Sequence, residues 1–438
     1  MNEFPTQFRG QILTPDAPDF PTALGALVAS QSVIAVVMPE SVADVALAVQ
    51  FAASQGVTPA IRSGGHSGPT YTPTSAAIVI DLARLDSIDV DGDVVRVGPG
   101  ARWGAVAATL ETHGLVLTSG DTASVGVGGL TLGGGVGWLV RQDGLTIDSL
   151  VEAEVVTSTG EIVSASASVN PDLFWGLRGG GGNFGVVTAF TFRARRLASV
   201  ISSVITLEIT DLAAAVIAWR DVMRTAPDQL TSTFSLTPAF GPEIPAVASI
   251  VSCWAGTDLE EARAALTPLF IVPGAISHTL ESAPYPSLLH ELPEMGGPPI
   301  TFVDSASFTP ELTDELAEAV LSTISTFGPT VFTIRYLGGA FSRVPADATA
   351  VAYRTSEALL FAAAVLPFDV DAQIRQRILD QWTELPGPRV GTFSTFISRT
   401  GPEILAELYP PSTLERLREI KRTWDPNNLF RLNQNVAP

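Results

Sequence analysis

Glycine is unevenly distributed in this chain of 438 residues, and three clusters of it lie before residue 190. The clusters span residues 64–68, 120–137 and 176–185; the second holds eight glycines in 18 residues and the third six in ten. Glycine adopts positive φ and lets another group approach the backbone closely, so clusters beside strand-like segments predict a bound cofactor contacted by backbone amides. Ordinary tight turns are the alternative, and they account more easily for one cluster than for three.

The second cluster predicts a loop whose successive N–H groups form a nest for an anion such as pyrophosphate. A flexible linker is the alternative interpretation. It is disfavoured because the segment carries apolar side chains that a fold would bury, namely Val125, Val127, Leu130 and Leu132.

The third cluster contains a match to G-x-G-x-x-G at residues 180–185. A dinucleotide fingerprint of this kind follows a strand and opens a helix. Here a helix-like segment, 172–177, comes first, and a strand-like segment, 184–194, follows. The sequence therefore argues against a Rossmann interpretation.

Composition excludes several function classes. The chain has 45 acidic and 25 basic residues, a net charge of −20, which argues against nucleic-acid binding. One cysteine, Cys253, cannot form an internal disulfide or a cysteine-based zinc site. The single lysine, Lys421, follows no glycine pattern, so a Walker-type phosphate loop is excluded. We expect no metal.

The ends and the apolar runs of the chain predict its location. The first residues lack the basic and apolar blocks of a signal peptide. The longest apolar runs fall short of the ~20 residues that a membrane span needs. The expectation is a soluble cytoplasmic protein that binds neither membrane nor nucleic acid.

Two kinds of segment alternation predict an α+β fold with more than one domain, as the length also requires. Short strands and helices alternate up to about residue 198, and 41–55 has helical spacing with Ser41 as a plausible N-cap. After that, longer strands alternate with long helices, which predicts an antiparallel sheet backed by helices.

Five sets of residues together resemble the berberine bridge enzyme-like flavin oxidases. They are Arg62-Ser-Gly-Gly-His66, Ser124-Val-Gly-Val-Gly-Gly129 with Gly133-Gly-Gly-Val-Gly137, Gly144-Leu-Thr-Ile-Asp148, the segment 170–187 and the segment 424–435. These oxidases belong to the p-cresol methylhydroxylase/vanillyl-alcohol oxidase superfamily. Bacterial members, 6-hydroxy-D-nicotine oxidase among them, look nearest. Residues 338–354 resemble the same family more weakly.

The resemblance implies a two-part FAD-binding domain of the p-cresol methylhydroxylase type plus a substrate domain with an antiparallel sheet backed by helices. Residues 1–198 would form the FAD-binding domain and 199–395 the substrate-binding domain. Residues 396–438 would be a C-terminal segment that returns to the FAD domain.

His66 matches the histidine that attaches covalently to the 8α carbon of FAD. Many relatives add a cysteine in the second loop, and here Thr122 occupies that position. The resemblance therefore implies a single histidyl link. Further cofactor contacts are implied for Arg62, Ser63, Gly64, Gly65, Ser67, Thr122, Ser124, Val125, Gly126, Gly128, Gly129, Gly135, Gly137, Trp138, Val155, Asn183, Gly185, Val187, Asn433 and Asn435.

Candidate catalytic residues are Tyr71 and Val125. Val125 matches the family's gatekeeper beside the flavin, where a small side chain leaves room for O2 and favours an oxidase. The usual Tyr-x-Asn pattern is missing from 391–396. That leaves Tyr71, five residues after His66, as the leading polar group beside the substrate, with a packed aromatic as the alternative.

Strand residues of the second half add weaker candidates. Asp304 and Arg335 would face either the pocket or solvent. Aromatic residues would form pocket lining or core, and an apolar lining favours an aromatic or alkaloid-like substrate; they are Phe234, Trp254, Phe302, Phe308, Phe332, Phe361, Phe393 and Phe396.

The predicted function is an FAD-dependent oxidase. It would take a hydride from a small alcohol or amine and reduce O2 to hydrogen peroxide, in secondary metabolism, as a monomer or homodimer. Two alternatives stay open: a dehydrogenase of the same fold that uses another electron acceptor, and a flavin-binding protein with impaired catalysis.

Overall fold

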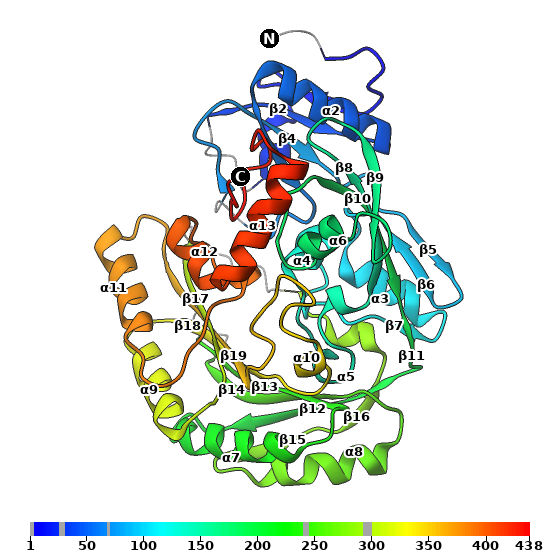
Figure 1. The fold of residues 1–438 in the computed structure, drawn as a ribbon. Coiled ribbons are helices and arrows are strands. Elements are labelled where there is room, and N and C mark those ends of the chain that lie inside the picture. Colours follow the sequence, from blue (N-terminus) through cyan, green and yellow to red (C-terminus); the bar gives the residue numbers. More distant parts are fainter. Residues whose placement is uncertain (1–3, 26–30, 68–70, 240–244, 292–299) are drawn as a thin grey trace.

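The structure is a computed structural model that describes residues 4–25, 31–67, 71–239, 245–291 and 300–438. Three main sheets make up its framework, with the first two on one side of the molecule and the largest on the other (Figure 1). A two-stranded ribbon, β7 (Leu115–Val116) with β11 (Arg195–Arg196), lies beside them. The chain is an α+β protein, as the sequence predicted.

The first sheet has the strand order β1-β2-β4-β3. Its strands are β1 (Gln11–Leu13), β2 (Val33–Met38), β3 (Thr58–Arg62) and β4 (Ala77–Asp81). The last three are parallel, and β2 connects to β3 through α2 (Val42–Gln55), while α1 (Phe20–Leu24) precedes β2. This places the end of β3, and the first glycine cluster, at one edge of the sheet.

The helix α2 begins and ends as the sequence predicts. The Ser41 hydroxyl accepts a hydrogen bond from the Asp44 amide at 3.1 Å, which satisfies one of the free N–H groups of the first turn. Gly56 ends the helix at φ 65°, a conformation that glycine adopts without strain.

The second sheet is antiparallel, in the order β5-β6-β10-β8-β9. Its strands are β5 (Ile88–Asp91), β6 (Val94–Val97), β8 (Leu150–Val156), β9 (Ile162–Ser166) and β10 (Val186–Arg193). Trp103 from α3 (Trp103–Glu111) and Phe174 from α6 (Pro171–Leu177) join one core with the strand residue Phe190.

The third glycine cluster lies between α6 and β10. The helix comes before it and the strand after it, so the structure excludes the Rossmann arrangement as the sequence predicted.

The second glycine cluster is not the continuous loop that the sequence predicted. Val127–Gly133 forms the helix α4, and Val140–Asp143 and Thr146–Asp148 form the short helices α5 and η3. Packing explains the difference, because Val127 is fully buried and Leu130 packs against the same core. Burial of this apolar side of α4 outweighs the poor helix propensity of its three glycines.

The third sheet is antiparallel throughout, with strands in the order β15-β12-β14-β13-β18-β19-β17 and β16 paired with β12. The strands are β12 (Val200–Leu207), β13 (Leu230–Thr237), β14 (Val247–Trp254), β15 (Ala275–His278), β16 (Glu281–Ala283), β17 (Ile300–Thr309), β18 (Thr330–Tyr336) and β19 (Ala358–Pro367).

Helices cover the outer face of this sheet (Figure 1). They are α7 (Leu212–Thr225), α8 (Leu259–Leu266), α9 (Asp314–Ile324) and α11 (Ala372–Thr383), with the short helix η4 (Thr267–Ile271) beside them. The short helix η5 (Tyr285–Leu288) packs instead against α3. The prediction of an antiparallel sheet backed by helices is confirmed.

The two faces of the third sheet differ in chemistry because side chains alternate along a strand. On β13, Leu230 and Phe234 are buried in the core that the helices cover. Thr233, Ser235 and Thr237 point the other way and line a cavity. The inner face therefore presents hydroxyl groups to the rest of the molecule.

The last part of the chain crosses back to the first two sheets (Figure 1). After α10 (Ala340–Arg343) and η6 (Ser394–Phe396), α12 (Pro402–Leu408) and α13 (Pro411–Trp424) carry it there. Ile420 of α13 packs in the core of the second sheet, and the tail reaches Asn183, whose Oδ1 accepts a hydrogen bond from the Val436 amide at 3.0 Å.

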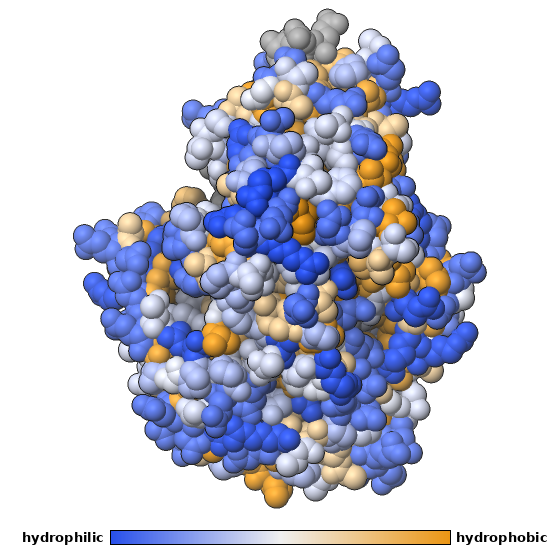
Figure 2. All heavy atoms as spheres, in the orientation of Figure 1, coloured by the Kyte–Doolittle hydropathy of each residue, from blue (hydrophilic) through white to orange (hydrophobic). Residues whose placement is uncertain are grey.

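The face of the molecule drawn in Figure 2 is largely hydrophilic, with apolar residues in small scattered groups. In the part of the chain that the structure describes, no helix is both long and apolar enough to cross a membrane.

Candidate active site

A cavity of about 2100 Å³ lies between the inner face of the third sheet and the loops of the first two sheets. Ligand pockets for drug-sized molecules measure about 300–1,000 Å³, so this volume has room for a dinucleotide together with a second small molecule. All three glycine clusters contribute residues to its wall. Gly68 of the first cluster lies outside the described residues.

The first two glycine clusters touch one another beside the cavity. A Cβ added to Gly64 would lie 2.3 Å from the Gly126 nitrogen, and one added to Gly126 would lie 2.3 Å from the Gly64 nitrogen. Arg102 joins the same loops by donating to the carbonyls of Gly64 at 2.6 Å and Ser124 at 2.8 Å. Gly64 and Gly126 are thus required by close backbone packing.

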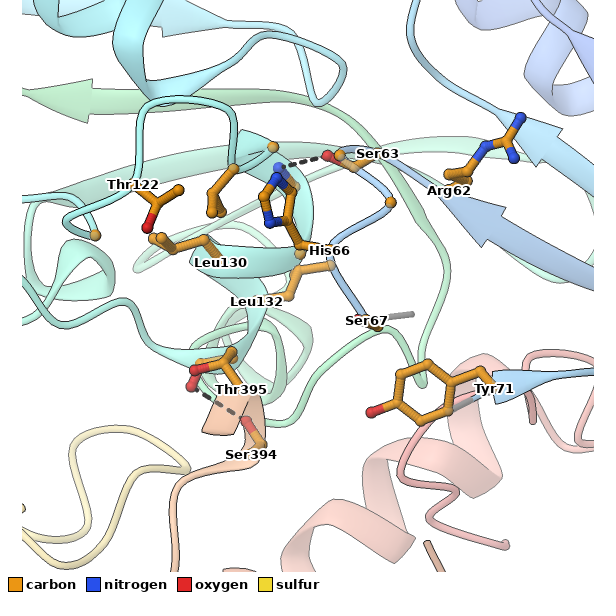
Figure 3. Close-up of a pocket in the computed structure, with 18 of the residues that line it drawn as sticks. Arg62, Ser63, His66, Ser67, Tyr71, Thr122, Leu130, Leu132, Ser394 and Thr395 are labelled. Carbon is orange, nitrogen blue, oxygen red and sulfur yellow. Dashed lines mark hydrogen bonds between the residues drawn. The ribbon is translucent and has the colours of Figure 1, made fainter. Parts of the chain in front are cut away.

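Ser63 also connects the two loops. Its hydroxyl donates to the Pro99 carbonyl at 2.6 Å and accepts from the Gly128 amide at 3.2 Å (Figure 3). Together these contacts fix the direction of the backbone that leads to His66.

The His66 side chain projects into the cavity near Thr122, Leu130 and Leu132 (Figure 3). Burial lowers the pKa of His66, while a hydrogen bond with the backbone of Ser124 opposes that shift. A lowered pKa leaves the imidazole neutral at pH 7, the form that acts as a nucleophile.

Four glycines present bare backbone to the cavity. A Cβ added at Gly129 would meet no atom within 4 Å, and at Gly65, Gly181 and Gly182 the nearest atom would be 3.8 to 4.0 Å away. All four line the cavity, at the positions where a cofactor bound by backbone amides would lie.

A buried polar atom without a partner lies in the same wall. The Oδ1 atom of Asn433 is buried and accepts no hydrogen bond from the described residues. A buried acceptor of this kind calls for a donor, and a hydroxyl or amino group of a dinucleotide would supply one. The bare glycines and this acceptor fit FAD.

Arg62 is held by the protein's own groups. Its guanidinium pairs with Asp81 at 2.7 Å and donates to the carbonyls of Ala23 and Leu24. Although Arg62 lines the cavity, these contacts occupy it, so the anionic part of a dinucleotide would depend on backbone amides.

The cavity brings together most of the residues predicted to contact the cofactor. Those that line it are Arg62, Ser63, Gly64, Gly65, His66, Ser67, Thr122, Val125, Gly126, Gly128, Gly129, Gly135, Trp138, Asn183, Gly185, Val187 and Asn433. The catalytic candidate Tyr71 lines it too. Ser124, Gly137, Val155 and Asn435 are not part of the wall. A Cβ at Gly137 would lie 1.9 Å from the Ser119 carbonyl oxygen, so that glycine permits loop packing.

Tyr71 lies across the cavity from His66, on the side where the C-terminal tail passes (Figure 3). Burial raises the pKa of Tyr71 to about 12, and the Gln434 side chain beside the hydroxyl opposes the shift. Tyr71 is therefore a neutral phenol at physiological pH, suited to hydrogen bonding.

The third sheet adds two charged residues to the wall, Asp304 on β17 and Arg335 on β18. Arg335 pairs with Asp121 at 2.5 Å, donates to the Val136 carbonyl at 3.1 Å and lies over the Trp138 ring. This side chain therefore connects the third sheet to the second glycine cluster. Both residues face the cavity, which is one of the two interpretations, pocket or solvent, that the sequence left open.

Only three of the eight aromatic candidates line the cavity: Phe302, Phe361 and Phe396. The other five, Phe234, Trp254, Phe308, Phe332 and Phe393, are buried in the hydrophobic cores. Several further residues line the wall but were not predicted, among them Arg102 and Tyr409, which stand in no motif that could have marked them. Asp121 and Gln434 also line it; they stand inside the second glycine cluster and the segment 424–435, but the motifs did not single them out.

Comparisons with known proteins agree with this geometry. Residues 33–166 match the FAD binding domain family, and residues 406–437 match the berberine and berberine like family. The FAD-linked oxidoreductase YgaK of Bacillus subtilis, itself uncharacterised, is 31% identical over 99% of this chain and 98% of its own. (R)-6-hydroxynicotine oxidase of Paenarthrobacter nicotinovorans is 28% identical over 99% of this chain and 98% of its own.

Solved structures show the same fold. The BBE-like 1 protein of Physcomitrella patens superposes with a TM-score of 0.87 at 22% identity, covering 98% of this chain and 97% of that one. Glucooligosaccharide oxidase from Acremonium strictum gives 0.83 at 24% identity, with the same coverage of 98% and 97%.

The fold and the cavity agree with these relatives, and the chain is an FAD-linked oxidoreductase. Within that class, the chain belongs to the berberine bridge enzyme-like family.

Proposed function

We propose that this protein is an oxidase that takes a hydride from a small alcohol or amine, with FAD attached through one covalent bond to His66 and O2 as the electron acceptor. Bound FAD would supply the redox chemistry, accepting the hydride and releasing hydrogen peroxide from O2. The protein's own part is to hold FAD, to orient the substrate and to exclude water.

The observation that carries the proposal is the position of His66. Its imidazole stands in the cavity on a loop that close packing of Gly64 against Gly126 holds in place. Burial keeps it neutral by lowering its pKa. A fixed, neutral imidazole is suited to attack the 8α carbon of FAD.

The residue at the position of the second covalent link supports a single bond between FAD and the protein. Glucooligosaccharide oxidase from Acremonium strictum has a 6-S-cysteinyl, 8α-N1-histidyl FAD. Here Thr122 lines the cavity, while Cys253, the one cysteine, is fully buried in another cluster. Burial raises the pKa of the Cys253 thiol to about 12, which removes its nucleophilic form.

Val125 supports the choice of O2 as acceptor. It lines the cavity beside the His66 loop, and its side chain is small.

The three segments of the chain would divide the binding between them. Residues of 1–198 and 396–438 would bind FAD, and residues of 199–395 would complete the substrate site.

Peroxide release and flavin reoxidation test the activity. Purified protein is screened against alcohols, sugars and cyclic amines, and we expect some members to bleach the flavin and release hydrogen peroxide. Reduced flavin that stays reduced in air for minutes would instead identify a dehydrogenase. A screen in which no compound bleaches the flavin contradicts both.

Acid precipitation tests the covalent bond. We expect the wild-type pellet to stay yellow and its His66 peptide to carry the mass of FAD. His66→Ala is expected to release its flavin to the supernatant, whereas His113→Ala, which changes an exposed histidine at the end of α3, keeps it in the pellet. A colourless wild-type pellet contradicts the proposal.

A further inference from the structure

Asp304 stands at the middle of β17 on the inner face of the third sheet, where it lines the cavity. Its register partner on β19 is Ala363, and Phe302 lies two residues earlier on the same face. Burial raises the pKa of Asp304, and hydrogen bonding to Ser398 partly opposes the shift. A hydroxyl is a neutral partner, so the negative charge of this carboxylate is not balanced by it.

Every arginine that lines the cavity is held by other groups. Arg62 and Arg335 pair with Asp81 and Asp121, and two more are bound to neutral acceptors. Arg102 donates to the carbonyls of Gly64 and Ser124, and Arg375 to the Thr301 hydroxyl and the Phe368 carbonyl, both at 3.3 Å.

The acidic residues of the cavity differ in their partners and in their exposure. Asp81 and Asp121 have arginine partners. Asp19 and Glu291 also line the cavity, but both are exposed, so water solvates their charges. Among the described residues, no ion pair joins Asp304 to a basic side chain. A half-buried carboxylate without a counter-charge is unfavourable, and its cost is removed when a cation binds beside it.

Two aromatic side chains of the cavity wall, Phe302 and Phe361, lie on the same face of the third sheet as this carboxylate. Phe302 precedes it on β17, and Phe361 packs against Phe396 with 5.1 Å between ring centroids. Faces of aromatic rings attract cations, by about 0.5–2 kcal/mol according to their exposure to water. A carboxylate set among such rings is suited to a positively charged group on an apolar frame.

We propose that Asp304 recognises the substrate by its positive charge, and that the substrate class is a small amine on an aromatic or cyclic apolar frame, which enters as its ammonium ion and gives one N–H proton to solvent before it is oxidised. The inference rests on the proposed function in taking this cavity as the substrate site. It narrows the alcohol-or-amine alternative to amines and assigns the selecting side chain.

Equilibrium binding to the holoenzyme tests the assignment with two probes of the same shape. Benzyltrimethylammonium carries a permanent charge and no nitrogen lone pair, so it cannot be oxidised as an amine. Neopentylbenzene is its neutral carbon isostere. The change in flavin absorbance on titration gives both dissociation constants.

We expect the wild-type protein to prefer the cation by at least about tenfold, which corresponds to about 1.4 kcal/mol. Asp304→Asn removes the charge in the same shape and is expected to abolish that preference while it leaves the affinity for neopentylbenzene within about twofold. Asp304→Glu keeps the charge and is expected to keep the preference. The control Glu318→Gln, an exposed position on α9, is expected to change neither constant.

Two results overturn the inference: a preference that survives in Asp304→Asn, or equal binding of the two probes by the wild-type protein. The ratio is measured within each variant, and Asp304→Ser, which also removes the charge, takes the place of Asp304→Asn if that variant does not fold. A cation preference that depends on Asp304, without peroxide release from any compound, supports this inference and refutes the proposed oxidase. Peroxide release without that preference supports the proposed oxidase and refutes this inference.

Discussion

The Nζ atom of Lys421 lies 2.7 Å from Oδ2 of Asp425, and both side chains are completely buried. The ammonium also donates to the carbonyls of Asn183 and Phe430, each at 2.8 Å. Its three N–H bonds thus join α13, the third glycine cluster and the tail. The ammonium group therefore supports the cavity wall from the protein interior, since Asn183 and Phe430 both line the cavity.

Chemical labelling provides a direct check of this arrangement. Lys421 is the only lysine of the chain, and burial lowers its pKa while Asp425 opposes the shift. We expect an amine-reactive ester to leave Lys421 unmodified in the native protein and to modify it fully in denaturant, as peptide mass spectrometry would show. Modification of the native protein at the denatured rate would contradict the structure.

Removing the ammonium leaves Asp425 as an unpaired buried charge. We expect Lys421→Met to lower the free energy of unfolding by about 3–5 kcal/mol, the usual loss when one partner of a buried pair is removed. Denaturant unfolding measures it. Arg422→Met, which removes an exposed pair with Glu415, is the neighbouring control and is expected to cost under about 1 kcal/mol.

Two glycines of the second cluster are expected to respond in opposite ways to the same substitution. Gly126→Ala would place a Cβ 2.3 Å from the Gly64 nitrogen, so we expect loss of folded protein. Gly129→Ala would place a Cβ in open space on the cavity side of α4, so the apoprotein is expected to keep its stability or gain up to about 1 kcal/mol from better helix propensity.

Flavin retention distinguishes the role of Gly129 from a purely structural one. We expect the added methyl group of Gly129→Ala to crowd the bound cofactor and to lower the flavin-to-protein ratio after purification. A variant that is as stable as the wild type and as fully loaded would show that FAD does not approach this backbone.

A second buried ion pair connects η3 to the segment between α10 and β19. Arg354 binds both oxygens of Asp148 at 2.8 Å, and its side chain is 1% exposed. We expect Asp148→Asn to destabilise the protein by about 3–5 kcal/mol in thermal or denaturant unfolding. Asp93→Asn breaks an exposed pair with Arg193 and is expected to cost under about 1 kcal/mol. Equal losses for the two variants would contradict this ranking.

The raised pKa of Tyr71 predicts a pH profile. Free tyrosine loses its proton near pH 10, whereas burial raises the pKa of Tyr71 to about 12. The neutral phenol therefore persists to higher pH, and no fall or rise in kcat/KM below pH 11 is expected to arise from it. Tyr71→Phe is expected to lower kcat/KM at all pH values and to leave the shape of the profile unchanged. If kcat/KM of the wild type falls at alkaline pH and this fall disappears in Tyr71→Phe, the fall arises from Tyr71 and the prediction is wrong.

Local rules explain what could be predicted without the structure. Ser41 caps α2 because a side-chain oxygen needs only its own first turn. The alternation of apolar and hydroxyl side chains along β13 predicts two faces of different chemistry, and the glycine motifs predict a dinucleotide cofactor. One local rule was overridden: burial of Val127 made a helix of residues expected to form a loop.

Partners far apart in the chain could not be predicted, since nothing in the local sequence encodes them. The pair Arg335–Asp121 joins residues 214 positions apart, and the mutual approach of Gly64 and Gly126 exists only once two loops are packed. The sequence by itself determined the family, the cofactor class and the position of His66. Tertiary structure alone decided which charges are balanced, because an ion pair forms only where folding brings both groups together. Among the residues that the structure describes, it left Asp304 without such a pair.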